Sequence, residues 1–214
     1  MQPRASVVRA TLSLVVVAAL IGAGSASAAT KKKTRKPPPP KPVCHLLGAG
    51  TGSTSDQSLK ITSADVATNA TTLTYVIRVA KLTTGADSNA PTGREWQFGF
   101  RQDGHLMTLA VDDGPFGTTT TFGLGKATLD TVKNEVRVTI GLRDLSNTYK
   151  TPMVRSGATV FTEFTARTES MIQMPSALKA VGLQSKLIDV AAADSAQSTA
   201  KYVAGYPSCV QVGS

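Results

Sequence analysis

The sequence predicts an all-β fold: a single antiparallel β-sandwich, immunoglobulin-like or jelly-roll-like, closed by one disulfide between its two ends. Apolar and polar residues alternate over many short segments, turn residues separate these segments, and long amphipathic helices are missing from the pattern. The only two cysteines are Cys44 and Cys209, which stand 165 residues apart. In an exported protein this even count favours one disulfide; a reactive thiol or a metal site with His45 are the alternatives.

The alternation with period two is clearest in residues 73–79, 96–100 and 136–140, and it is typical of half-buried strands. The other predicted strands are residues 59–66, 105–111, 118–124 and 158–167. Asp103-Gly104 predicts a hairpin turn between two of these strands. Residues 176–193 fit either a short helix or a last strand.

Residues 1–28 predict a secretory signal peptide. Arg4 and Arg9 precede an apolar run of 15 residues, and Ala26-Ser27-Ala28 supplies the small residues that signal peptidase needs. The run is shorter than the roughly 20 residues of a membrane-spanning helix, so we expect cleavage after Ala28 and no transmembrane anchor afterwards. An uncleaved anchor is the alternative. The mature protein is therefore expected to be secreted.

Residues 29–43 predict a disordered Lys/Pro-rich spacer in front of the β-sandwich domain at residues 44–214. Four consecutive prolines, residues 37–40, favour an extended polyproline II conformation. The candidates for contact with an anionic cell-envelope polymer or polysaccharide are Lys31, Lys32, Lys33, Arg35, Lys36 and Lys41. Such contact would associate the protein with the cell wall; a soluble tether is the alternative.

The charge balance separates the spacer from the domain. The chain has 23 Lys and Arg against 14 Asp and Glu, a formal net charge of +9. Two of the basic residues lie in the signal segment and six in the spacer, which leaves 15 beside all 14 acidic residues. A nearly neutral domain has no excess of positive charge for a nucleic-acid-binding face, so no nucleic-acid partner is expected. The oligomeric state stays open.

The sequence contains none of the common catalytic motifs. G-x-S-x-G, H-E-x-x-H and a glycine-rich phosphate loop are missing, and His45 and His105 are the only histidines. No catalytic residue is predicted. We expect a non-catalytic module with a binding or structural role; a small secreted hydrolase or redox protein is the alternative.

Two polar loops, residues 81–94 and 112–118, are the predicted contact surface, because loops that join sandwich strands often carry binding residues. The candidate ligand contacts are Asp87, Asn89, Arg94, Trp96 and His105. Trp96 shares the parity of Phe98 and Phe100, which favours the core; the alternative places it in a ligand cleft.

Asp112 and Asp113 are the candidate calcium ligands, since paired carboxylates on a turn supply oxygen ligands. A solvated turn is the alternative interpretation. No other cofactor is expected.

The strand pattern resembles that of secreted bacterial β-sandwiches of the DOMON and family 9 carbohydrate-binding-module type. Residues 59–66 and 73–79 are similar to their opening strand pair, 96–100 to a central strand and 134–140 to a late strand. Asp194-Ser195-Ala196, with Tyr202 and Gly205, is similar to their closing segment.

The resemblance implies a non-catalytic module that binds sugars or, in some DOMON proteins, haem. Haem is not expected here. His105 and Met107 would point to the same face of one strand, whereas axial ligands approach the ring from opposite sides.

Overall fold

The computed structural model describes residues 38–115, 117–170, 193–210 and 212. The fold belongs to one compact unit, Pro39–Ser214. The predicted signal segment and most of the predicted spacer lie outside the described residues, as does all but the last residue of the ambiguous segment 176–193.

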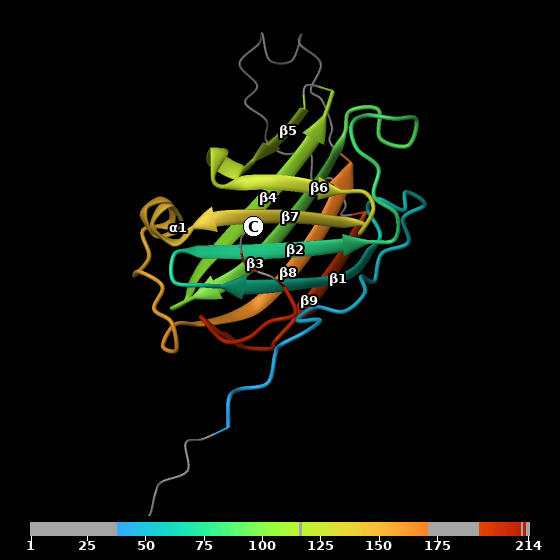
Figure 1. Ribbon diagram of the computed structural model, residues 1–214. Helices are drawn as coiled ribbons and strands as arrows, with labels where there is room; N and C mark the ends of the chain where they lie inside the picture. Colours follow the sequence, from blue (N-terminus) through green and yellow to red (C-terminus); the bar gives the residue numbers. More distant parts are fainter. Residues whose placement is uncertain (1–37, 116, 171–192, 211, 213–214) are drawn as a thin grey trace, which may run out of the picture. The chain divides into compact units, whose positions relative to one another are not determined.

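The chain folds into two antiparallel sheets, which confirms the predicted all-β sandwich. The first sheet has the order β1–β2–β7–β6, and the second has the order β10–β8–β3–β4–β5, with β9 also paired to β8. Figure 1 shows the strands of the four-stranded sheet crossing in front of those of the six-stranded sheet. The strands are β1 Ile61–Thr68, β2 Thr72–Val79, β3 Arg94–Gln102, β4 His105–Gly114, β5 Gly117–Thr120, β6 Lys126–Asp130, β7 Glu135–Gly141, β8 Val160–Ser170, β9 Asp194–Ser198 and β10 Tyr202–Val203.

The core lies between the two sheets and is filled by alternate residues of their strands. Phe98 and Phe100 of β3 are fully buried, and the ring of Phe98 stacks on Tyr75 of β2 with centroids 5.2 Å apart. Phe100 meets Phe161 of β8 edge to face at 5.1 Å. Aromatic pairs in these geometries contribute beyond the apolar area that they bury. The alternation read from the sequence therefore identified the inward faces correctly.

Asp194 joins the two sheets at their edges. Its buried carboxylate, at the start of β9, accepts hydrogen bonds from the backbone N–H groups of Gly52 (2.6 Å) and Ile61 (2.8 Å). Ile61 belongs to the other sheet, so the side chain connects β1 with β9. A Cβ at Gly50 would overlap this carboxylate, which explains the glycine there.

The predicted disulfide is confirmed. Cys44 and Cys209 are bonded, and the backbone of Val43 pairs with the segment around Ser208, donating to Pro207 O at 3.0 Å. Beyond the disulfide, Val210 packs on Ala67 and Val76, which face outward from the four-stranded sheet. Both ends of the domain are thus held on one sheet.

The six-stranded sheet contains a β-bulge in β8. The register between β3 and β8 shifts between Gly99 and Arg101, and Glu163 lies at this irregularity with φ of +51°. A non-glycine residue with positive φ is uncommon in a strand, and bulges change the direction of side chains locally. The bulge sets the position of the Glu163 side chain on the outer face of the sheet.

Candidate functional site

The two polar loops predicted as a contact surface do come together, but around a buried arginine. Arg94 is 1% exposed; its Nε donates to Asp56 at 2.8 Å and its Nη2 to Asp87 at 2.6 Å. The backbone N–H of Gly85 donates to Asp113, which links the first loop to the end of β4. Arg94 is therefore an internal counter-ion that orders the loops, which corrects its assignment as a ligand contact.

Asp87 belongs to the same network. The hydrogen bond from Arg94 is the main influence that lowers the pKa of Asp87, to about 2, and the backbone N–H groups of Asn89 and Ala90 contribute. The Asp87 carboxylate is thus occupied by groups of its own domain. The side chain of Asn89 remains exposed at the tip of the loop.

Trp96 lies in the core. Its side chain is fully buried, and the indole N–H donates to Ser58 O at 2.8 Å. Burial leaves the ring no surface for a ligand, so the core interpretation holds and the ligand-cleft alternative is wrong. His105 is exposed at the opposite end of β3 and β4 from Arg94, next to the hairpin turn at Asp103-Gly104.

Asp112 and Asp113 are extended residues of β4 rather than parts of a turn. Consecutive strand residues point to opposite faces, so their carboxylates do not converge on one cation. Asp113 accepts the Thr118 hydroxyl at 2.8 Å. Within the described ranges, no group of three or more His, Cys, Asp or Glu side chains is arranged to hold a metal ion.

A row of carboxylates crosses the outer face of the six-stranded sheet. Glu95 of β3 is paired in register with Asp112 of β4 on one side and with Glu169 of β8 on the other. Burial is the main cause that raises the pKa of Glu95 to about 7, and the charges of Asp112 and Glu169 add to it. Burial also raises the pKa of Asp112.

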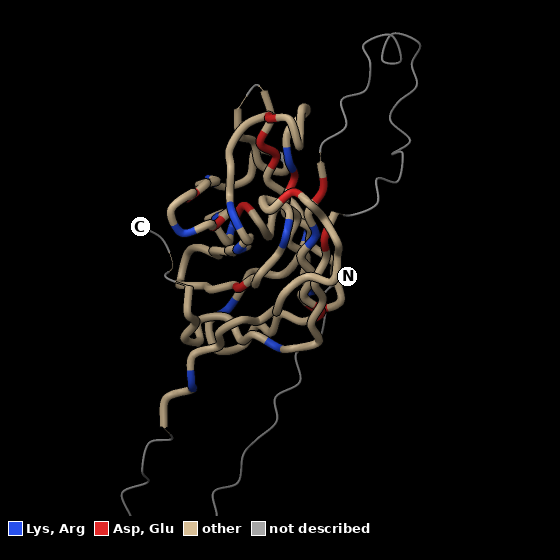
Figure 2. Tube along the Cα trace, turned by 90° about the vertical axis from the view of Figure 1, so that its right-hand side faces the viewer, with Lys and Arg blue, Asp and Glu red and all other residues tan. Residues whose placement is uncertain are grey.

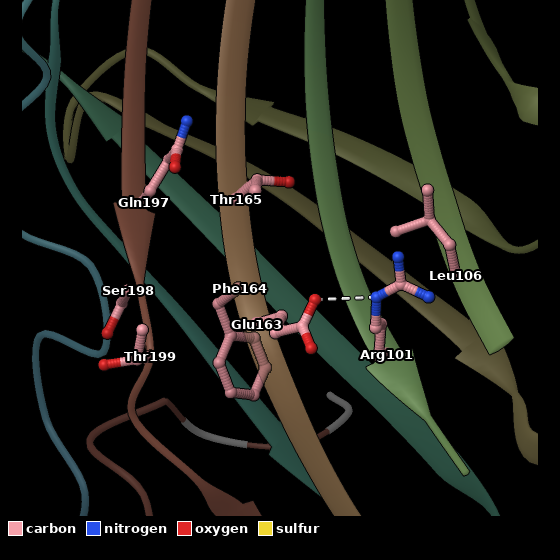
Figure 3. Close-up of a pocket in the computed structure, with 8 residues that line it drawn as sticks. All are labelled: Arg101, Leu106, Glu163, Phe164, Thr165, Gln197, Ser198 and Thr199. Carbon is pink, nitrogen blue, oxygen red and sulfur yellow. Dashed lines mark hydrogen bonds and ion pairs between the residues drawn. The ribbon is translucent and has the colours of Figure 1, made fainter. Parts of the chain in front are cut away.

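A hollow of about 600 Å³ lies on the same outer face, at the other end of β3. Its lining comes from four strands and the residue after β9, namely Arg101, Leu106, Glu163, Phe164, Thr165, Gln197, Ser198 and Thr199. Figure 3 shows Glu163 and Arg101 side by side, with Thr165 and Gln197 above them. The Arg101 Nε donates to Glu163 at 2.7 Å, and its Nη1 donates to Gly104 O at 2.7 Å.

The hollow combines polar groups with one exposed apolar side chain. Hydroxyl or amide groups are presented by Thr165, Gln197, Ser198 and Thr199, while Leu106 is 55% exposed. Gly99 leaves the centre of this face without a side chain, and the Thr165 hydroxyl occupies the space where a Cβ would lie. A surface of this composition suits a ligand with many hydroxyl groups and some C–H surface.

The sequence did not identify this hollow. Arg101 directly follows the predicted strand at residues 96–100, and Glu163 lies within the predicted strand at residues 158–167. Their approach depends on the register of β3 with β8 and on the bulge at Glu163, which no local motif specifies. The available signal was Leu106, an apolar residue that lies out of parity with the inward-facing Met107 and Leu109 of the same predicted strand.

The described part of the domain carries charged residues of both signs. Figure 2 shows Lys and Arg interspersed with Asp and Glu along its trace. Lys41, the one spacer cation within the described residues, is exposed. The other five spacer cations lie outside those residues. Among the described helices, none is long and apolar enough to cross a membrane.

The structure is a disulfide-closed β-sandwich with a polar hollow on the outer face of its six-stranded sheet. Comparison with models of known families, with characterised proteins and with solved structures finds no match to the chain. The resemblance to DOMON and family 9 carbohydrate-binding modules stays a prediction.

Proposed function

We propose that the protein is an exported, non-catalytic binding module whose ligand is a polysaccharide or another hydroxyl-rich polymer of the cell envelope. The observation that carries this proposal is the hollow on the six-stranded sheet. Its hydroxyl and amide side chains supply both donors and acceptors, and Leu106 supplies an apolar contact for the C–H face of a ring. Binding through a sheet face needs no catalytic group.

Export is supported by the disulfide, because such bonds persist in oxidising compartments. We propose that the Lys/Pro-rich spacer adds an electrostatic contact with an anionic envelope polymer. If so, deleting residues 31–41 should lower cosedimentation with cell envelope at low salt and have little effect at high salt. Unchanged partitioning at low salt would remove the spacer from the proposal.

The test of the module is binding of the full chain to a panel of insoluble and soluble polysaccharides. Leu106→Ser should weaken binding, because it removes the apolar contact in the hollow. Val132→Ser is the matched control, since Val132 is 91% exposed on the turn between β6 and β7. Absence of binding to every polysaccharide, or equal effects of the two variants, would contradict the proposal.

A hydrolase is the second candidate, and the carboxylate row is the observation that favours it. Glu95, with a pKa of about 7, could act as a general acid beside Asp112. Turnover of glycoside or ester substrates that disappears in Glu95→Gln would favour this candidate over a binding module. Activity that persists in Glu95→Gln would exclude Glu95 as the acid.

A further inference from the structure

The ion pair between Arg101 and Glu163 is part of the lining of the hollow, and we propose that it sets the ligand specificity of this site. The inference rests on the proposed function: it assigns to the hollow an uncharged ligand that carries hydroxyl groups on adjacent carbons.

Both partners keep groups available for a ligand. Arg101 uses Nε for Glu163 and one Nη1 hydrogen for Gly104 O. A guanidinium has five N–H donors, so further donors remain on Nη1 and Nη2, and the carboxylate of Glu163 retains acceptor positions. Neighbouring hydroxyl groups can each donate and accept a hydrogen bond. Such a ligand can therefore bridge the arginine and the glutamate without breaking the pair.

The lining has no excess charge. Of the residues that line the hollow, Arg101 carries a positive charge, Glu163 carries a negative one and the others are uncharged. An anionic ligand would approach the Glu163 carboxylate as closely as the guanidinium, and a cationic ligand would meet Arg101 beside Glu163. Repulsion of this kind selects against charged competitors and gives specificity by disfavouring them.

The bulge positions the carboxylate for this role. The side chains are 38% exposed for Arg101 and 62% exposed for Glu163, and exposed pairs contribute little to folding stability. The left-handed backbone at Glu163 is nevertheless adopted by a residue other than glycine. A conformation that costs free energy and serves a pair of low structural value is typical of a functional position.

The experiment measures binding of the full chain by calorimetry to three soluble oligosaccharides of equal length. Maltohexaose is the neutral probe, hexagalacturonate the anionic probe and fully deacetylated chitohexaose the cationic probe. The variants are Glu163→Gln, which leaves Arg101 without its counter-charge, and Arg101→Gln, which does the same for Glu163. Lys133→Gln is the matched control, because it breaks the exposed pair of Lys133 with Asp130 on the other sheet.

We expect the wild-type chain to prefer the neutral probe, with an affinity that does not change with salt. Glu163→Gln should weaken neutral binding about tenfold and shift the preference to the anionic probe; Arg101→Gln should weaken it similarly and shift the preference to the cationic probe. Lys133→Gln should change nothing. Thermal unfolding of each variant checks that the fold is intact, and only small shifts are expected for an exposed pair.

Two failures are distinguishable. If the wild-type chain binds no carbohydrate at all, the proposed function is wrong. If it binds carbohydrate but prefers a charged probe, or if neither variant shifts the preference, the module stands and the role of the ion pair is overturned.

Discussion

Two arginines of the same strand have opposite roles because their surroundings differ. Arg94 begins β3 and is buried between Asp56 and Asp87, whereas Arg101 lies near the end of β3, exposed beside Glu163. Removing one partner of a buried pair leaves an uncompensated charge, while an exposed partner is readily hydrated. In the sequence the two differ only in parity: Arg94 shares the inward parity of Trp96 and Phe98, and Arg101 does not.

Arg94→Met should therefore lower the free energy of unfolding by about 3–5 kcal/mol, because Asp56 loses its counter-ion inside the domain. Arg101→Met, the matched change on the same strand, should cost no more than about 1 kcal/mol. Urea unfolding of both variants measures the difference. Equal losses would show that Arg94 is not the internal counter-ion described above.

Glu95 predicts a dependence of stability on pH. Its pKa is raised from 4.5 to about 7, so between these values the folded state binds more protons than the unfolded state. The free energy of unfolding should fall as the pH rises from 5 to 7 and remain lower above it. Because Glu95 is partly exposed, we expect a change on the order of 1–2 kcal/mol.

Glu95→Gln should flatten this dependence and stabilise the domain at pH 8. Denaturant unfolding from pH 5 to 8 compares the two chains. Parallel pH profiles for both chains would contradict the assignment of the titration to Glu95.

At the scale of elements, alternation identified the long strands of the core and, in part, β5, and it missed the short strands β6, β9 and β10. Strand β6, Lys126–Asp130, and strand β9, Asp194–Ser198, are short and have few apolar residues. They are held by pairing with β7 and β8, a tertiary effect that no local pattern carries. Helix α1, Leu142–Tyr149, was also not predicted. Its N-cap residue, Gly141, has no side chain that could accept a capping hydrogen bond, so the usual sequence signal for a helix start is missing.

The candidate site, like the strands, was predictable from the sequence only in part. Polar composition was enough to identify the loops that meet around Arg94, although not the burial of that arginine. The hollow was not predictable, because four strands contribute to it and one of them contains a bulge. Local sequence indicates which residues face outward but does not show which of them become neighbours.

The end of α1 provides a prediction at this scale. Lys150 follows the helix with φ of +54°, a left-handed conformation that favours glycine. Lys150→Gly should raise the free energy of unfolding by about 0.5–1 kcal/mol. Gly157→Ala is the converse control: Gly157 has φ of +75° and space for a Cβ, so this change should lower stability through the backbone alone. Thermal unfolding measures both; destabilisation by Lys150→Gly would contradict the account.

At the scale of the whole molecule, the disulfide connects the two ends of the domain. It closes a loop of 165 residues, for which loss of entropy in the unfolded chain predicts stabilisation of up to about 5 kcal/mol. The double variant Cys44→Ser/Cys209→Ser should lose most of this. The reduced wild-type chain is the matched comparison and should unfold at the same denaturant concentration as the variant. If the variant unfolded at the same denaturant concentration as the oxidised wild-type chain, the disulfide would not stabilise the fold.

We expect the outer face of the six-stranded sheet to bind a hydroxyl-rich polymer through its hollow. The most direct measurement is an NMR titration of the full isotope-labelled chain with fragments of the polysaccharide that it binds best. We expect saturable shift changes concentrated at Arg101, Thr165 and Gln197. Changes concentrated instead at the loops around Asp87 and Arg94, or no saturable change with any polysaccharide, would contradict it.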